Sequence, residues 1–169
     1  MFRNGLAGNP LAFGARGNGP ARPDLGDGTF VSAANEAGLT DTGQGRGAAC
    51  FDADRDGDLD IVITNNQSDS SVVFYRNELA TGDNYLAINL ESSGLNTAGI
   101  GAWISVDDDV LVRVREIHGG NNFVSQSPAE AHFGLGSADS VDVTVNWPDG
   151  SQTVMTGVSA NQKLTIVQQ

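Results

Sequence analysis

Five aspartates occupy every second position between residues 52 and 60, and they are the side chains of this sequence best suited to binding a metal ion. The segment reads Asp-Ala-Asp-Arg-Asp-Gly-Asp-Leu-Asp. Carboxylates this close together repel one another, and a hard divalent cation removes that repulsion. Calcium binds about 6–8 oxygen ligands in a flexible loop, whereas magnesium needs a stiffer octahedron. The spacing therefore predicts a calcium site, with a solvated acidic turn as the alternative.

The aspartates alternate along the loop, and this alternation predicts how they share the coordination. We expect three side-chain ligands, then a backbone carbonyl, then a closing bidentate carboxylate, in the order Asp52, Asp54, Asp56, Asp58 and Asp60. Gly57 at the sixth position allows a sharp turn. An EF-hand places glutamate at the twelfth position, which here is Ile63. The pattern thus favours a shorter calcium loop between β-strands, with a structural role.

Two histidines raise the alternative of a hydrolase. His118 follows Glu116 at strand spacing, so both side chains lie on one face of the expected strand. The sequence contains no Gly-x-Ser-x-Gly elbow, and neither His118 nor His132 lies near a nucleophile signature. We therefore predict that the chain is not an enzyme and that both histidines have structural, hydrogen-bonded roles.

Planar polar side chains raise a second alternative, a sugar- or carboxylate-binding groove. The candidates follow one another along a short stretch of chain: Arg113, Arg115, Glu116, Asn121 and Asn122. A salt-bridged strand followed by a Gly-Gly-Asn-Asn turn is the preferred interpretation of these residues. Trp103 and Trp147 are interpreted first as core or interface anchors, and only second as sugar platforms.

The overall charge excludes several classes of partner. The 169 residues include 21 acidic and 9 basic side chains, for a net charge of −12. Such a chain has no basic face for nucleic acid or anionic lipid. No apolar run approaches the roughly 20 residues that span a bilayer, and residues 1–4 lack the pattern of a signal peptide. A single cysteine, Cys50, excludes an internal disulfide and a cysteine-rich zinc site.

Period-two alternation dominates the remaining sequence and predicts an all-β fold. Apolar side chains alternate with polar ones in short segments that turn residues separate, including Asp107–Asp109 and Pro148–Gly150. The expected strands cover residues 59–64, 72–75, 85–90, 102–106, 110–117, 141–147, 153–155 and 164–167. Residues 30–37 are the one helix candidate.

Composition divides the chain into three parts. Residues 1–25 are rich in Gly, Pro and Asn and predict an extended arm with little apolar surface to bury. Residues 26–82 contain the acidic loop, and residues 83–169 contain most of the expected strands. The aromatic-Arg-Asn pieces at residues 2–4 and 75–77 begin two similar segments, 2–7 and 75–80, which indicates a faint internal repeat.

Residues 26–82 resemble an FG-GAP/VCBS-type repeat. The resemblance rests on Gly-Asp-Gly-Thr-Phe at residues 26–30, Ala-Gly-Leu at 37–39, Gly-Arg-Gly at 45–47 and the acidic loop. In that family the loop binds calcium within a β-propeller blade. A ring needs several four-stranded blades, and this sequence holds little more than one repeat. The resemblance implies a partial, blade-like unit.

Residues 83–169 resemble the ASPIC/UnbV domain. The matching motifs are Asn-Tyr-Leu at 84–86, Gly-Ile-Gly-Ala at 99–102, Arg-Glu-Ile-His-Gly-Gly at 115–120, Ser-Gln-Ser at 125–127, His-Phe-Gly-Leu-Gly at 132–136 and Trp-Pro-Asp-Gly at 147–150. This resemblance implies a β-sandwich-like domain. Together the two imply an extracellular or cell-surface protein with calcium in the repeat and a structural or adhesive role.

Unpaired strand edges predict self-association. A partial blade leaves strand edges open, and open edges recruit another chain unless they are blunted. We therefore expect a homo-oligomer, in its bolder form an extracellular filament, assembled through strand edges and the N-terminal arm. A glycan or cell-surface partner is the alternative. Loss of assembly on calcium removal, with no sugar binding or turnover, would separate the structural module from the carbohydrate-binding module and the hydrolase.

Overall fold

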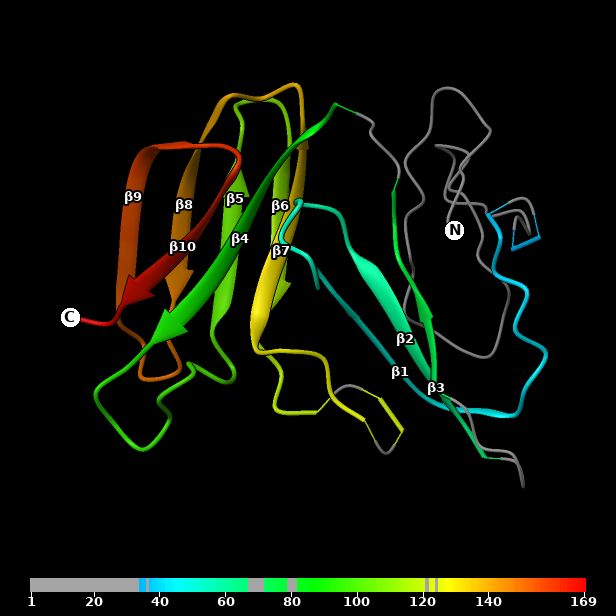
Figure 1. Ribbon diagram of the computed structural model, residues 1–169. Coiled ribbons are helices and arrows are strands. Elements are labelled where there is room, and N and C mark those ends of the chain that lie inside the picture. Colours follow the sequence, from blue (N-terminus) through cyan, green and yellow to red (C-terminus); the bar gives the residue numbers. More distant parts are fainter. Residues whose placement is uncertain (1–33, 36, 67–71, 79–81, 121, 124) are drawn as a thin grey trace. The chain divides into compact units, whose positions relative to one another are not determined.

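The computed structural model describes residues 34–35, 37–66, 72–78, 82–120, 122–123 and 125–169. Its regular elements are all strands, which confirms the predicted all-β fold. The chain divides into two compact units. The first contains strands β1 to β3, and the second contains β4 to β10 together with the loop residues Asp54–Gly57. Figure 1 labels the strands of both units.

The first unit is an antiparallel sheet in the order β1-β2-β3. The strands are β1 (Gly45–Phe51), β2 (Asp60–Asn65) and β3 (Val72–Tyr75). Strands β2 and β3 confirm the segments expected there. Strand β1 was not expected, because glycine and alanine, which have low strand propensity, occupy most of it.

The described part of the first unit has a small apolar core. Among the described residues, Ala37, Ile61 and Tyr75 are its buried apolar side chains. The hydroxyl of Tyr75 accepts a hydrogen bond of 2.7 Å from the backbone N–H of Asp41, which attaches the segment before β1 to the sheet. Cys50 packs against this core, and its burial raises the pKa of the thiol, in keeping with its interpretation as a small apolar residue.

The second unit is a β-sandwich. One sheet has the order β10-β4-β7 and the other the order β6-β5-β8-β9. In Figure 1 the strands β10, β4 and β7 lie in front of the other four. The seven strands are β4 (Asn84–Glu91), β5 (Trp103–Asp107), β6 (Val112–Glu116), β7 (Glu130–Gly136), β8 (Ser140–Asn146), β9 (Gln152–Ser159) and β10 (Gln162–Val167).

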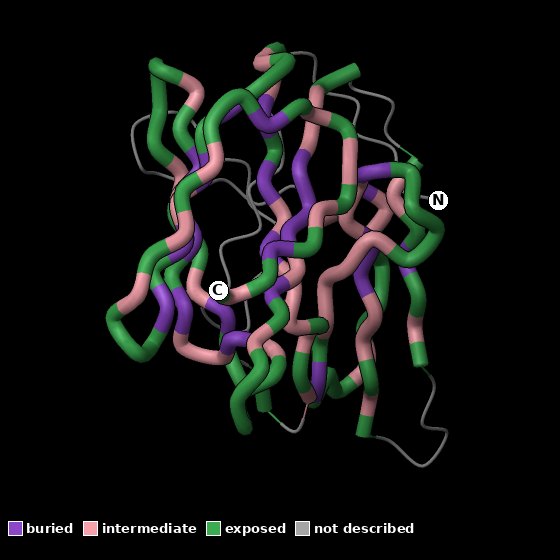
Figure 2. The backbone as a smooth tube through the Cα atoms, turned by 90° about the vertical axis from the view of Figure 1, so that its left-hand side faces the viewer, coloured by how far each residue is buried: buried purple, intermediate pink, exposed green. Residues whose placement is uncertain are grey.

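Side chains from both sheets meet in one core. Leu86 and Ile88 from β4 and Phe133 from β7 face Ile104 from β5 and Val143 from β8, and all five are fully buried. Buried positions alternate with more exposed ones along β5, β7 and β8, whereas three consecutive residues of β4 are buried. Figure 2 colours the backbone by burial. This alternation is the physical origin of the period-two pattern in the sequence.

Two features of the sandwich differ from the sequence-based expectations. Strand β7 was not expected as a strand, although Ala131, Phe133 and Leu135 alternate along it and are buried. Strand β10 pairs with β4 in parallel, with Leu164 opposite Ile88. The expected hairpins on either side of residues 107–109 and 148–150 are confirmed as the antiparallel pairs β5-β6 and β8-β9.

The predicted helix and arm fall largely outside the described residues. Residues 34, 35 and 37 of the helix candidate form turns. The predicted arm over residues 1–25 lies entirely outside the described part of the chain, as do residues 67–71. Within the described residues, no helix has the length and hydrophobicity needed to cross a membrane.

Candidate functional site

The acidic loop connects β1 to β2. Phe51 and Asp60 are opposite one another in the antiparallel pair, so the ends of the loop are fixed by the sheet. Two residues within it have left-handed backbone geometry, Arg55 at a φ of 67° and Gly57 at a φ of 98°. The loop therefore turns back sharply over a few residues, as Gly57 predicted.

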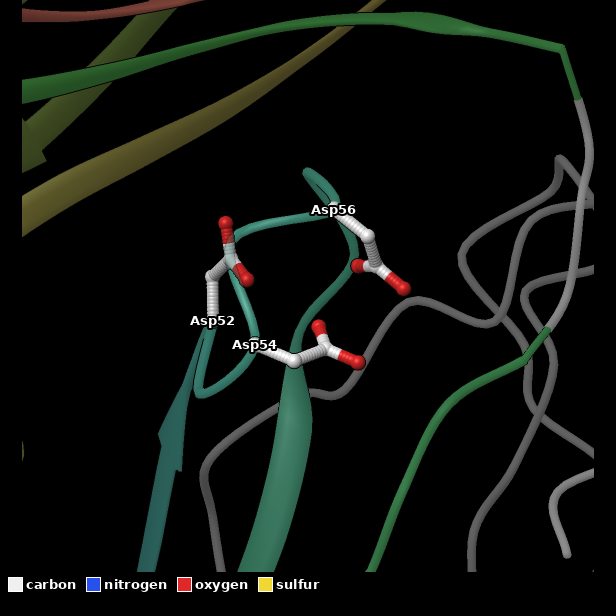
Figure 3. Close-up of side chains that lie close together, drawn as sticks. All are labelled: Asp52, Asp54 and Asp56. Carbon is white, nitrogen blue, oxygen red and sulfur yellow. The ribbon is translucent and has the colours of Figure 1, made fainter.

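Three of the five predicted ligands lie together in this loop. Oxygens of Asp52, Asp54 and Asp56, one from each residue, all lie within 4.8 Å of one another. Figure 3 shows the three side chains gathered around the loop. Asp54 and Asp56 are exposed and Asp52 is half-buried, so solvent has access to the cluster. Three convergent carboxylates that solvent can reach could hold a metal ion.

Asp60 occupies a different environment from these three. Its side chain is 1% exposed, and it is the one buried charged residue among those described. One carboxylate oxygen accepts a hydrogen bond of 3.0 Å from the N–H of Ala53, and the other accepts one of 2.7 Å from the N–H of Asn77. Asp60 thus connects the start of the loop to the segment after β3. An ionised carboxylate keeps further lone pairs, so these two bonds leave it able to bind a cation as well.

Asp58 is half-buried and lies outside the cluster of three carboxylates. The sequence assigned it a backbone carbonyl ligand, which requires no side chain in the cluster. That assignment stays a prediction, as does the closing role of Asp60.

The tip of the loop contacts two residues that sequence reasoning did not connect with it. The Nε2 atom of His132 lies 2.7 Å from the carbonyl oxygen of Gly57. The ring of His132 also stacks on Tyr85, with 5.7 Å between centroids and an interplanar angle of 4°. Both residues belong to motifs of the C-terminal resemblance, but spacing along the chain carries no signal that they meet Gly57.

The other histidine and the predicted groove lie elsewhere. Nδ1 of His118 lies 3.7 Å from Oε1 of Glu116, and the His118 side chain is about half exposed. Arg113 donates to Asp108 at 2.8 Å. The guanidinium carbon of Arg115 lies 5.6 Å from the centroid of the Phe133 ring. Asn122 forms an isolated β-bridge with Ser125, and Asn121 lies outside the described residues. The described groove candidates thus each contact a different partner.

The neighbours of the Asp108 carboxylate strongly lower its pKa. Its hydrogen bond with Arg113, followed by those from the N–H groups of Leu111 and Val110, lowers its pKa to about 2. These contacts close the turn between β5 and β6. Asp108 therefore has a structural explanation and lacks the pKa of a general base at neutral pH.

The two tryptophans have opposite environments. Trp147 is 4% exposed, and its indole N–H donates to Thr153 at 2.9 Å, so it is a core residue as expected. Trp103 is 50% exposed on β5. Its neighbours across the sheet are Glu116 on β6 and Asn146 on β8, and Asn146 is in turn opposite Gln152 on β9.

Comparison with known proteins supports the resemblance in the C-terminal part. Residues 92–169 match the family described as ASPIC and UnbV. The chain is also 29% identical over 119 residues to cartilage acidic protein 1 of Homo sapiens and, over the same length, to that of Mus musculus. The protein of Xenopus tropicalis is 28% identical over 115 residues. The matched region covers 66% of this chain and 17% of the human protein.

The chain therefore spans less than a fifth of the length of these relatives. The resemblance of residues 26–82 to an FG-GAP/VCBS repeat stays a prediction. Residues 92–169, the part that is similar to the ASPIC and UnbV family, contain the sandwich strands β5 to β10.

Proposed function

We propose that this chain is a calcium-stabilised structural or adhesion module of an extracellular protein. The observation that carries the proposal is the convergence of Asp52, Asp54 and Asp56 in a loop whose sharp turn depends on Gly57. The similarity to cartilage acidic protein 1 and the ASPIC and UnbV match support a structural role outside the cell. Calcium would neutralise the mutual repulsion of the carboxylates and fix the connection between β1 and β2.

Isothermal titration calorimetry tests the cation site directly. We expect calcium to bind with a stoichiometry of one and magnesium to bind more weakly, because the cluster offers several flexible oxygen ligands. Asp54→Asn should weaken binding strongly. Asp109→Asn removes the same charge from an exposed turn far along the chain and should leave binding unchanged. Equal calcium affinity in wild type and Asp54→Asn would contradict the proposal.

We propose that two copies of this chain associate with each other through the edge strand β6. Val112 and Val114 on this strand, with Val110 and Leu111 just before it, are exposed apolar side chains beside an open sheet edge. Such an edge favours strand addition. A net charge of −12 opposes contact between copies, so assembly should increase with calcium and with salt.

Sedimentation velocity with calcium and then with a chelator tests this assembly. Val112→Lys and Val114→Lys should shift the distribution towards monomer, because a charge on the edge prevents pairing. Leu95→Lys places the same charge in an exposed loop and serves as the control. A monomer at all concentrations, with and without calcium, would overturn the proposal of self-association.

Carbohydrate binding is a second candidate function, supported by the exposure of Trp103. A row of side chains crosses one face of the sheet β6-β5-β8-β9 and consists of Glu116, Trp103, Asn146 and Gln152. An exposed indole flanked by carboxylate and amide groups suits stacking and hydrogen bonding with a neutral sugar. The acidic surroundings disfavour sulfated or other anionic sugars.

Tryptophan fluorescence measures such binding. Because Trp147 is buried, a neutral oligosaccharide should change the emission of Trp103 alone. The change should disappear in Trp103→Phe and persist in Trp147→Phe. An unchanged spectrum across a panel of neutral glycans would exclude this candidate.

A further inference from the structure

The tip of the acidic loop belongs to the same compact unit as the β-sandwich, and a hydrogen bond connects the two. Nε2 of His132 lies 2.7 Å from the carbonyl oxygen of Gly57. A backbone carbonyl only accepts hydrogen bonds, so Nε2 must carry the proton and donate it. This bond fixes the orientation of the peptide group between Gly57 and Asp58.

A second, independent contact at the tip involves Tyr85. Gly57 is buried, and a Cβ atom added to it would lie 2.3 Å from Cε1 and 2.4 Å from Cδ1 of Tyr85. The aromatic ring therefore occupies the space where any other side chain would begin. Gly57 also has a φ of 98°, which other residues rarely adopt. Position 57 consequently requires glycine both for its backbone geometry and for its approach to Tyr85.

The two contacting side chains belong to paired strands of the sandwich. Tyr85 on β4 is opposite Gly134 on β7, and His132 is opposite Ala87, so the two rings are diagonal neighbours on one sheet. Their stacking at 5.7 Å joins them into one surface. The residues that follow them in the sequence, Leu86 and Phe133, are fully buried in the sandwich core. The surface beneath Gly57 is therefore anchored to the sandwich core on both strands.

We propose that Tyr85 and His132 are positioning residues that hold the acidic loop in its cation-binding conformation before the cation arrives. The inference rests on the proposed calcium binding. Gly57 lies between Asp56 and Asp58, two of the proposed ligands, so fixing its peptide restricts the backbone on both sides. A loop that is already ordered loses less conformational entropy on binding, which raises its affinity.

Calorimetry on the full chain tests the hydrogen bond. His132→Ala removes the donor and should weaken calcium binding by about tenfold or more, as loss of a partner outside the ligand shell typically does. His132→Gln supplies an amide N–H in its place and should recover much of the affinity. His118→Ala removes a half-exposed histidine that pairs with Glu116 and should leave the affinity unchanged. Equal affinities in wild type and His132→Ala would overturn the inference while the calcium site itself stands.

A double-mutant cycle between Gly57 and His132 tests whether His132 affects calcium binding through the loop. Gly57→Ala changes only the loop, and it should weaken calcium binding because the new Cβ meets Tyr85. Adding His132→Ala should then weaken binding much less than it does in wild type, since the carbonyl is already displaced. Fully additive losses would contradict a shared mechanism.

Hydrogen exchange in chelated protein tests the pre-ordering without any cation. The amides of residues 53–58 should exchange faster in His132→Ala than in wild type, while those of β8 should not change. Unaltered exchange in the loop would overturn the inference. Wild-type protein that binds no calcium would overturn both the proposed function and the cation role of Tyr85 and His132, and exchange would then report only the structural contact.

Discussion

The two units achieve order in different ways. The sandwich buries side chains from two sheets in a common core around Phe133, Leu86 and Ile104. The three-stranded sheet has a core of Ala37, Ile61 and Tyr75 among the described residues. A sheet of three short strands with so little apolar burial is marginal by itself. Among the described residues, polar interactions therefore contribute a larger share of the order in the first unit than in the second, and the cation proposed above would add to them.

The buried carboxylate of Asp60 is the clearest sign of this difference. The sandwich core contains apolar side chains, whereas the first unit buries a charged group at the start of β2 and satisfies it with the N–H groups of Ala53 and Asn77. Hydrogen bonds to an ionised group are stronger than those between neutral groups. Removing the carboxylate would leave both N–H donors without an acceptor, which costs stability. We therefore expect a single polar substitution to lower the stability of the first unit more than that of the second.

The largest effect is expected from truncating the sandwich core. Phe133→Ala leaves a cavity between two sheets and should lower the free energy of unfolding by about 3–5 kcal/mol. Phe74→Ala makes the same change on β3, where the ring is exposed, and should cost less than about 1 kcal/mol. Urea denaturation followed by circular dichroism measures both. Similar losses for the two variants would contradict the contrast between the units.

Asp60→Ala should have the next largest effect. It leaves the N–H groups of Ala53 and Asn77 without their acceptor, and we expect a loss of about 2–4 kcal/mol even in chelated protein. Asp54→Ala removes an exposed carboxylate and should hardly change the stability of the chelated protein. Thermal unfolding in the presence of a chelator distinguishes them. A chelated Asp60→Ala variant as stable as wild type would show that Asp60 acts only as a ligand.

Removing calcium should lower the free energy of unfolding by a smaller amount. The loss depends on the free calcium concentration before removal, because a ligand that binds the folded state stabilises it more at a higher free concentration. At a free calcium concentration about 100 times the dissociation constant, binding contributes about 2.7 kcal/mol. We expect hydrogen exchange to accelerate in β1 and β2, which flank the loop, and to stay constant in β8. Magnesium at the same concentration is the control. Uniform acceleration over all strands would mean that the cation stabilises the sandwich as well.

The smallest effect is expected at the turn between β5 and β6. The pKa of Asp108 is lowered to about 2 in the folded chain, chiefly by its hydrogen bond with Arg113, and an unfolded aspartate has a pKa of about 3.9. The contribution of Asp108 to stability is therefore present above about pH 4 and is lost as the pH falls towards 2.

Unfolding measured against pH tests this turn. Asp108→Asn should be slightly less stable than wild type at neutral pH, and the two curves should converge near pH 2. Because the pair lies near the surface, added salt should reduce the difference. A constant difference down to pH 2 would show that the carboxylate charge is not responsible.

The sequence predicted most strands because the sandwich has one buried face on each sheet. Strand β8 is an example, with Val141, Val143 and Val145 buried and their neighbours exposed or half-buried. Strand β7 carries the same alternation, but its glycines and histidine conceal it. Apolar and polar side chains hardly alternate along β1, since most of its side chains are small. Alternation reports burial on one face, and it weakens wherever the side chains are small or polar.

The sequence by itself determined the local chemistry: an all-β chain, an acidic loop with glycine at its turn, and an ASPIC/UnbV resemblance in its C-terminal part. These follow from residue types at fixed short spacings. The tertiary structure alone decided which residues meet across the chain. It buried Asp60 while leaving Asp54 exposed, paired β10 with β4 in parallel, and brought His132 to Gly57 across 75 positions of sequence. Such contacts depend on how strands pair and sheets pack, and no local pattern encodes that pairing.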